Sequence, residues 1–153
     1  MSYTADGSER VQYDEELIEV LGILQDDGAR ALMREALTSA RPGARAAAAR
    51  GLGLLGDTPS IPLLLTAFSD PGSPRRVRRA AAQSLSSFGS PEIGAAVLGF
   101  LESQDPDLRR WTLLLLRDTG SPIGGAVAER MAWFDPDPEI RSLADTLATV
   151  LPR

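Results

Sequence analysis

The sequence predicts an all-α protein that folds as a right-handed superhelix of about four two-helix repeats. One observation is a sequence motif that occurs three times, in which a glycine is followed closely by a hydroxyl residue and a proline. Its members are Gly56 with Thr58-Pro59, Gly89 with Ser90-Pro91, and Gly120 with Ser121-Pro122. A second observation is an arginine that recurs in the same frame at steps of 33, 31 and 32 residues: Arg45, Arg78, Arg109 and Arg141.

Apolar residues accompany each of these arginines at helical spacing. They lie one residue before the arginine and three and seven residues after it, so that they form one stripe on a helix. The three positions are Ala44, Val77, Leu108 and Ile140; then Ala48, Ala81, Thr112 and Ala144; then Leu52, Leu85, Leu116 and Ala148. We therefore expect arginine-bearing helices over residues 42–55, 74–88, 107–119 and 139–151.

A turn and a second helix separate each arginine helix from the next. The glycine ends one helix, the hydroxyl oxygen is expected to cap the amides of the following helix, and proline suits its first position. The second helices are expected over 61–69, 93–103 and 123–134, each ending near an aspartate: Asp70, Asp105 or Asp135. Two short helices per unit cannot bury their apolar faces alone, so neighbouring units must stack.

The N-terminal region differs in charge from the rest. Residues 1–27 hold eight acidic residues against Arg10, whereas residues 28–153 have a small positive excess. We expect residues 1–12 to be a disordered acidic segment and residues 13–153 to form one domain. Within that domain a helix from Asp14 is expected to cover the first repeat with Leu17, Val20, Leu21 and Leu24.

The segment from Val77-Arg78 through the alanine cluster to Leu85 resembles HEAT repeats, in particular the short bacterial type named after phycobilisome lyases. This resemblance covers roughly residue 28 to the C-terminus. It implies a ladder in which turn aspartates bind the arginines of neighbouring helices. The sequence offset from Asp135 to Arg141 is the usual six residues. The offset from Asp70 to Arg78 is longer, with residues 71–74 as the extra bulge, and the offset from Asp105 to Arg109 is shorter, so an irregular ladder is expected at these two aspartates.

Composition excludes several kinds of chemistry. The chain has no cysteine, histidine, lysine or asparagine, and arginine supplies all 16 basic side chains. No histidine base, thiolate nucleophile, lysine Schiff base or imidazole metal ligand is therefore present. We expect a bacterial, cytoplasmic protein without enzymatic activity, cofactor, metal or membrane span.

The resemblance places the arginine-bearing helices on the concave surface of the stack. Solvent-facing positions in register include Ala46 and Gly53 in the first unit and a cluster of arginines in the middle units. The residues predicted to bind a protein partner with an acidic or acidic-apolar segment are Arg50, Arg76, Arg79, Gln83, Arg110, Trp111, Leu114 and Arg117. Arginine and tryptophan are enriched among binding hot spots. The alternative is that the arginines form a solvated face and that Trp111 is packing.

Two other functions and a cation site are alternatives to this prediction. Nucleic acid is the alternative ligand of a basic groove, although the total charge of −5 opposes it. Phycobilin-lyase-like chromophore handling is implied only by the resemblance. The run from Asp135 to Glu139 has the carboxylate density of a cation site, but acid and proline at a helix entry are better explained by capping.

Two further surfaces are singled out by apolar residues. Leu143 and Val150 widen the apolar stripe of the last helix, which suggests a homodimer or another partner at the C-terminal helix. The alternative is that this terminal helix frays. Trp133 and Phe134 are interpreted as core or turn packing, with an interaction site as the alternative.

Overall fold

The computed structural model describes residues 2–3, 9–10 and 27–152. Strands β1 (Ser2–Tyr3) and β2 (Glu9–Arg10) pair antiparallel, with Ser2 opposite Arg10. The expected segment boundary at residue 12 and the expected helix from Asp14 lie outside the described residues.

The rest of the described chain is helical and forms a stack of four helix pairs. The first repeat contains α2 (Asp27–Ala36) and α3 (Pro42–Leu54), and the second contains η1 (Thr58–Ser60), α4 (Ile61–Ser69) and α5 (Arg75–Phe88). The third contains α6 (Pro91–Val97), η2 (Leu98–Glu102) and α7 (Pro106–Asp118), and the fourth contains α8 (Gly124–Phe134) and α9 (Pro138–Ala148). The all-α prediction and the helical solenoid are confirmed.

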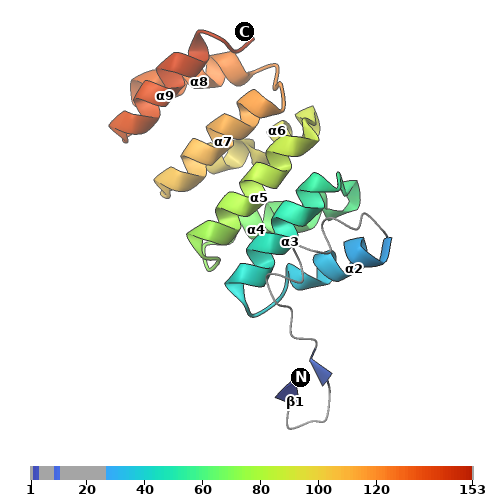
Figure 1. The fold of residues 1–153 in the computed structure, drawn as a ribbon. Coiled ribbons are helices and arrows are strands. Elements are labelled where there is room, and N and C mark those ends of the chain that lie inside the picture. Colours follow the sequence, from blue (N-terminus) through green and yellow to red (C-terminus); the bar gives the residue numbers. More distant parts are fainter. Residues whose placement is uncertain (1, 4–8, 11–26, 153) are drawn as a thin grey trace.

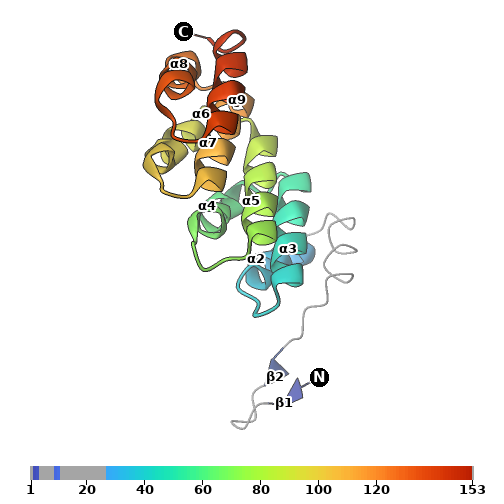
Figure 2. The same ribbon diagram turned by 90° about the vertical axis from the view of Figure 1, so that its left-hand side faces the viewer.

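The helices form two layers. Helices α3, α5, α7 and α9 lie side by side in one layer, which carries the repeated arginines (Figure 1). Turned by 90°, the stack shows α4, α6 and α8 in the other layer (Figure 2). Helices α2 and α9 lie at opposite ends of the stack.

The repeated glycines end the arginine-bearing helices by adopting left-handed backbone angles. Their φ values are 59° at Gly56, 58° at Gly89 and 64° at Gly120. Only glycine enters this region without a steric penalty. The glycine frame that aligned the repeats in the sequence therefore corresponds to the same turn in three successive units.

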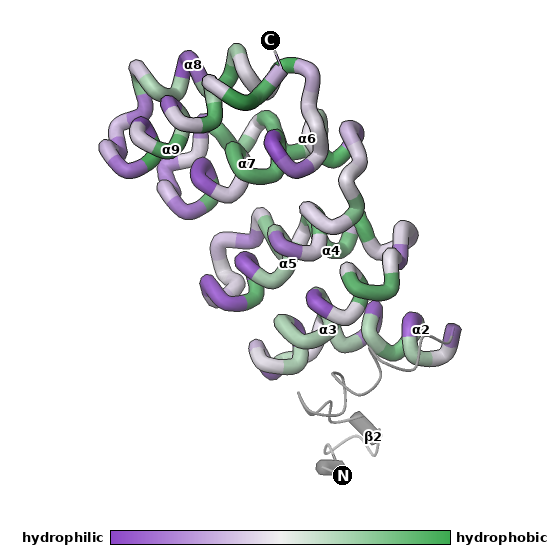
Figure 3. The backbone as a smooth tube through the Cα atoms, turned by 45° about the horizontal axis from the view of Figure 1, so that its top comes forward, coloured by the Kyte–Doolittle hydropathy of each residue, from purple (hydrophilic) through white to green (hydrophobic). Residues whose placement is uncertain are grey.

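The predicted apolar stripe forms the core. Of its twelve residues, all but Ala148 are buried, and Val77, Leu85 and Ile140 have an exposed fraction of 0%. One apolar cluster runs from α2 to α7 and a second joins α7, α8 and α9, with Leu114 packed against both. Figure 3 shows the corresponding alternation of hydrophobic and hydrophilic segments along the helices.

The expected hydroxyl caps are wrong. Ser90 is the N-cap of α6 and Pro91 follows it, but the Ser90 hydroxyl donates to the Glu92 carboxylate instead of accepting from a backbone amide. Helix α8 begins at Gly124, beyond the buried Ser121. Aspartates cap two of the arginine-bearing helices instead: Asp105 accepts from the Asp107 amide, and Asp137 accepts from the Glu139 and Ile140 amides.

Helices α3 and α5 approach each other closely because small residues face each other. A Cβ atom built on Gly53 would lie 2.7 Å from the Cβ atom of Ser84, and the Ser84 hydroxyl donates to the Ala49 carbonyl at 2.6 Å. Ala46 is only 2% exposed. The prediction that Ala46 and Gly53 face solvent is therefore wrong, since the alanine- and glycine-rich α3 is buried over most of its surface.

Aromatic side chains fill the space between the second and third repeats. Phe68 packs edge-on against Phe100, with ring centroids 5.6 Å apart, and tilted against Trp111 at 6.4 Å. These rings come from α4, η2 and α7, and they join the second repeat to the third within the larger apolar cluster. In the part of the chain that the structure describes, no helix is both long enough and apolar enough to cross a lipid bilayer.

Candidate functional site

A groove of 360 Å³ lies between α5 and α7, and we call it the α5–α7 groove. Its walls carry arginines from both helices: Arg75 and Arg79 from α5, and Arg110 and Arg117 from α7. The remaining lining residues are Ala82, Gln83, Ser86, Trp111, Leu114, Leu115 and Asp118. Six of the eight residues predicted to bind a partner are brought together here.

The other two predicted residues lie outside this groove. Arg50 lines a neighbouring 180 Å³ groove between α3 and α5, which shares Gln83 with the first. Arg76 is exposed near the start of α5 and lines neither groove.

Acidic side chains of the chain itself pair with several of these arginines. Arg110 Nη2 lies 2.6 Å from Glu139 Oε2, and Arg117 Nε lies 2.5 Å from Asp118 Oδ1. Arg75 forms a bidentate pair with Asp107, in which the Nη2 to Oδ1 distance is 2.8 Å. These acidic partners were not predicted from the sequence. Asp107 and Glu139 lie about one repeat length after Arg75 and Arg110, and this spacing is the signal that could have indicated them.

Arg79 and Gln83 offer unpaired groups to the groove. Both are exposed, and the side chain of neither forms a hydrogen bond or ion pair with any residue among those described. Arg79 thus supplies an uncompensated positive charge on the α5 wall. The exposed pairs on the α7 wall are weak, since surface ion pairs contribute about 0–1 kcal/mol, so an incoming acidic group can exchange with them at low cost.

Trp111 lies at the base of the groove and is only 8% exposed. The guanidinium groups of Arg75 and Arg78 lie over its ring, 5.8 Å and 5.7 Å from the ring centroid. Together with its contact with Phe68, this arrangement gives Trp111 a packing role and makes it a support for the arginines above it. The half-buried Leu114 is the larger apolar surface that the groove offers.

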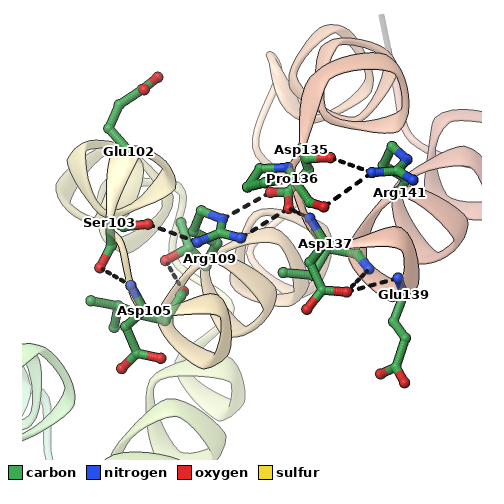
Figure 4. Close-up of polar contacts among 12 residues, drawn as sticks. Glu102, Ser103, Asp105, Arg109, Asp135, Pro136, Asp137, Glu139 and Arg141 are labelled. Carbon is green, nitrogen blue, oxygen red and sulfur yellow. Dashed lines mark hydrogen bonds and ion pairs between the residues drawn. The ribbon is translucent and has the colours of Figure 1, made fainter.

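Below the groove, an arginine–aspartate ladder joins successive repeats. Arg78 Nη1 lies 2.6 Å from Asp105 Oδ2, and Arg109 binds both oxygens of Asp135, at 2.9 Å and 3.0 Å. Figure 4 shows the Arg109 pair and the carbonyl contact of Arg109 with Ser103. The irregularity expected at Asp105 is therefore wrong: its short offset from Arg109 does not prevent its pairing with Arg78 of the preceding repeat.

The electrostatics of the ladder favour ionised aspartates. Burial alone would raise the pKa of Asp135, but hydrogen bonds from Arg109 and from the Asp137 amide hold that pKa below its ordinary value. Hydrogen bonds from Arg34 on α2 likewise lower the pKa of Asp57, which is 2% exposed. The Arg34–Asp57 pair joins α2 to the turn after α3, and the Arg109–Asp135 pair joins α7 to the turn before α9.

The carboxylates between Asp135 and Glu139 are all engaged in folding contacts. Asp135 binds Arg109 and Asp137 caps α9 (Figure 4). Glu139 pairs with Arg110. Within the described ranges, no group of three or more acidic, histidine or cysteine side chains is arranged to hold a metal ion. The capping interpretation of this run is thus the one that its contacts support.

The interpretation of Trp133 and Phe134 as packing is wrong. These side chains at the end of α8 are 80% and 78% exposed. A pocket of 230 Å³ beside them is lined by Phe134, Met131, Val127 and Leu101, and by Arg109 and Asp135 of the ladder. Val150, near the C-terminal end, is also 69% exposed.

A family model described as HEAT repeats matches residues 3–76 and 72–148. No curated protein sequence matches the chain.

Proposed function

Because this chain belongs to the HEAT repeat family, which generally provides non-enzymatic scaffolds for protein interactions, we propose that it is an adaptor whose α5–α7 groove binds an acidic or acidic-apolar segment of a partner protein. The observation that carries this proposal is the groove itself, which has arginines on both walls, an uncompensated Arg79 and a half-buried Leu114 between them.

The chemistry of the groove fits an extended acidic segment. Carboxylates of the partner would bind Arg79 directly and would exchange with Glu139 at Arg110 and with Asp118 at Arg117. An aliphatic or aromatic side chain of the partner would cover Leu114. Because the groove is formed by packed helices that need no ordering on binding, little conformational entropy opposes association.

A selection from short random displayed peptides tests the proposal, because it samples acidic, basic and apolar segments on equal terms. We expect the recovered peptides to be rich in aspartate and glutamate with at least one large apolar residue. Their affinity should fall at least about tenfold in the Arg79→Glu variant and should weaken with added salt.

Arg130→Glu is the matched control. Arg130 on α8 is also exposed, and its only ion pair within the described chain is the exposed contact with Glu102 of η2. This variant should retain the affinity of the unmodified protein. Peptides without acidic residues, or peptides that bind equally well to the Arg79→Glu variant, would refute the proposed face.

Duplex DNA serves as the competing ligand in the same experiment. A salt-sensitive gel shift with DNA, together with the absence of acidic peptides from the selection, would replace the adaptor proposal with nucleic-acid binding. No shift at low salt is the result that we expect.

A further inference from the structure

The repeated arginines share one contact that positions their guanidinium groups. Each donates to a carbonyl at the end of the preceding helix or in the turn just after it. Arg45 binds the Ser39 carbonyl at 2.7 Å, Arg78 binds Phe68 at 3.2 Å, Arg109 binds Ser103 at 2.8 Å and Arg141 binds Asp135 at 2.7 Å. This contact leaves the other donors of each guanidinium available for a carboxylate.

Between the first and second repeats, the expected aspartate does not reach its arginine. By register, Asp70 should meet Arg45 as Asp105 meets Arg78 and Asp135 meets Arg109. Instead its oxygens accept from the Gly72 amide and the Ser73 hydroxyl, both at 2.8 Å. No ion pair joins Asp70 to Arg45 within the part of the chain that the structure describes.

The cause is the segment from Asp70 to Pro74. In the third repeat Asp105 is the N-cap of α7, whereas in the second repeat Pro74 is the N-cap of α5 and makes no side-chain hydrogen bond to the helix amides. Asp70 therefore does not cap α5, and its carboxylate instead stabilises the turn over Gly72 and Ser73. This turn lies in the bulge that the sequence indicated at residues 71–74.

Arg45 is left with an unsatisfied donor. Its Nε atom is buried and has no hydrogen-bond partner, the one such side-chain atom in the described residues. Burial of an unpaired guanidinium donor is unfavourable. The Arg45 side chain as a whole is partly exposed, so a carboxylate that displaces the groups covering Nε and accepts from it recovers that free energy. A pocket of 390 Å³ lies at this place, lined by Arg45, Asp70 and the apolar side chains Leu37, Leu63 and Ala67.

We propose that this pocket binds a carboxylate from outside the chain, an aspartate or glutamate side chain of a partner protein, which takes the place on Arg45 that a ladder aspartate holds in the next two repeats. The methylene groups of the incoming residue would lie against Leu37, Leu63 and Ala67. The site is separate from the α5–α7 groove and shares no lining residue with it.

N-acetyl-glutamate is the probe for this site, and the observable is the Nε–Hε signal of Arg45 in ¹⁵N-labelled full-length protein. We expect a saturable shift of that signal with N-acetyl-glutamate and none with N-acetyl-glutamine methylamide, in which both carboxylates are replaced by uncharged amides. Arg45→Gln should abolish the accompanying shifts of neighbouring amides, whereas Arg76→Gln, at an exposed arginine outside both pockets, should leave them unchanged.

A second variant tests the site without altering Arg45. Asp70 shares the pocket and repels an incoming anion, so Asp70→Asn should tighten the binding of N-acetyl-glutamate by about threefold or more. The absence of a saturable shift in both the unmodified protein and Asp70→Asn would overturn the proposal. Saturation by inorganic phosphate but not by N-acetyl-glutamate would also overturn it, because the site would then select a different anion.

Failure here and failure of the adaptor proposal are distinguishable. The Arg79→Glu variant should bind N-acetyl-glutamate at Arg45 as the unmodified protein does. Arg45→Gln should in turn keep its affinity for peptides selected on the α5–α7 groove.

Discussion

Arg109 on α7 binds both carboxylate oxygens of Asp135, and the two side chains are only 7% and 3% exposed. This pair joins the third repeat to the fourth, and Asp135 also accepts from the Asp137 amide where the chain turns into α9. One buried carboxylate therefore connects the ladder to the start of the last helix.

Asp135→Asn should lower the free energy of unfolding by about 3–5 kcal/mol, because it leaves the Arg109 charge buried without its counter-charge. Urea unfolding followed by circular dichroism measures this loss. Asp107→Asn is the matched control, since Asp107 pairs with the largely exposed Arg75 and should lose about 1 kcal/mol or less. Equal losses in the two variants would contradict a special role for the buried pair.

The stability of the protein should fall in acid. The pKa values of Asp57, Asp107 and Asp135 are all lowered in the folded state, the first two mainly by hydrogen bonds from Arg34 and Arg75. A carboxyl group whose folded pKa lies below its unfolded value of about 3.9 stabilises the fold above that pH and loses this contribution as the pH falls through the folded pKa.

We therefore expect the urea midpoint to be nearly constant near neutral pH and to decline below about pH 4. In Asp135→Asn the decline should be shallower, because one of the titrating groups has been removed. A midpoint that rises on acidification, or an identical slope in the two proteins, would contradict the assignment of these aspartates.

Much of this architecture is readable from the sequence because it depends on spacing. The arginine period and the apolar stripe follow from helical geometry, and the glycine positions follow from the left-handed turn that each must adopt. The convergence of Arg79, Arg110 and Arg117 on one groove follows from the same register.

What the sequence did not predict depends on contacts across the stack. The spacing makes Ser90 a plausible cap, but its hydroxyl donates to the Glu92 carboxylate. Spacing alone does not decide whether the hydroxyl binds a backbone amide or this side chain. Gly53 shares its register with Ser86 and Arg117, which predicts a surface position, yet the small residues of α3 let α5 approach and cover it. The acids that pair with Arg75 and Arg110 come from the next repeat, where only the three-dimensional stack brings them near.

The close approach of α3 and α5 gives a third prediction. Gly53→Ala should destabilise the protein by about 1–3 kcal/mol, because its Cβ would lie 2.7 Å from the Ser84 side chain and 2.8 Å from the Ser84 backbone. Gly99→Ala is the control, since nothing lies within 4 Å of a Cβ at that position. Thermal unfolding of both variants checks the difference, and no loss in Gly53→Ala would mean that the two helices separate freely.

The last prediction compares two aromatic residues that occupy the same place in their repeats, two residues before a ladder aspartate. Phe68 precedes Asp70 and is fully buried between Phe100 and Trp111 of the following repeat, whereas Trp133 precedes Asp135 and is 80% exposed. Phe68→Ala should therefore lower the free energy of unfolding by about 3–5 kcal/mol, and Trp133→Ala should change it by about 0.5 kcal/mol or less. Urea unfolding of the two variants gives both values. A large loss in Trp133→Ala would show that this ring is covered in solution, and it would then be a contact residue and not a free surface side chain.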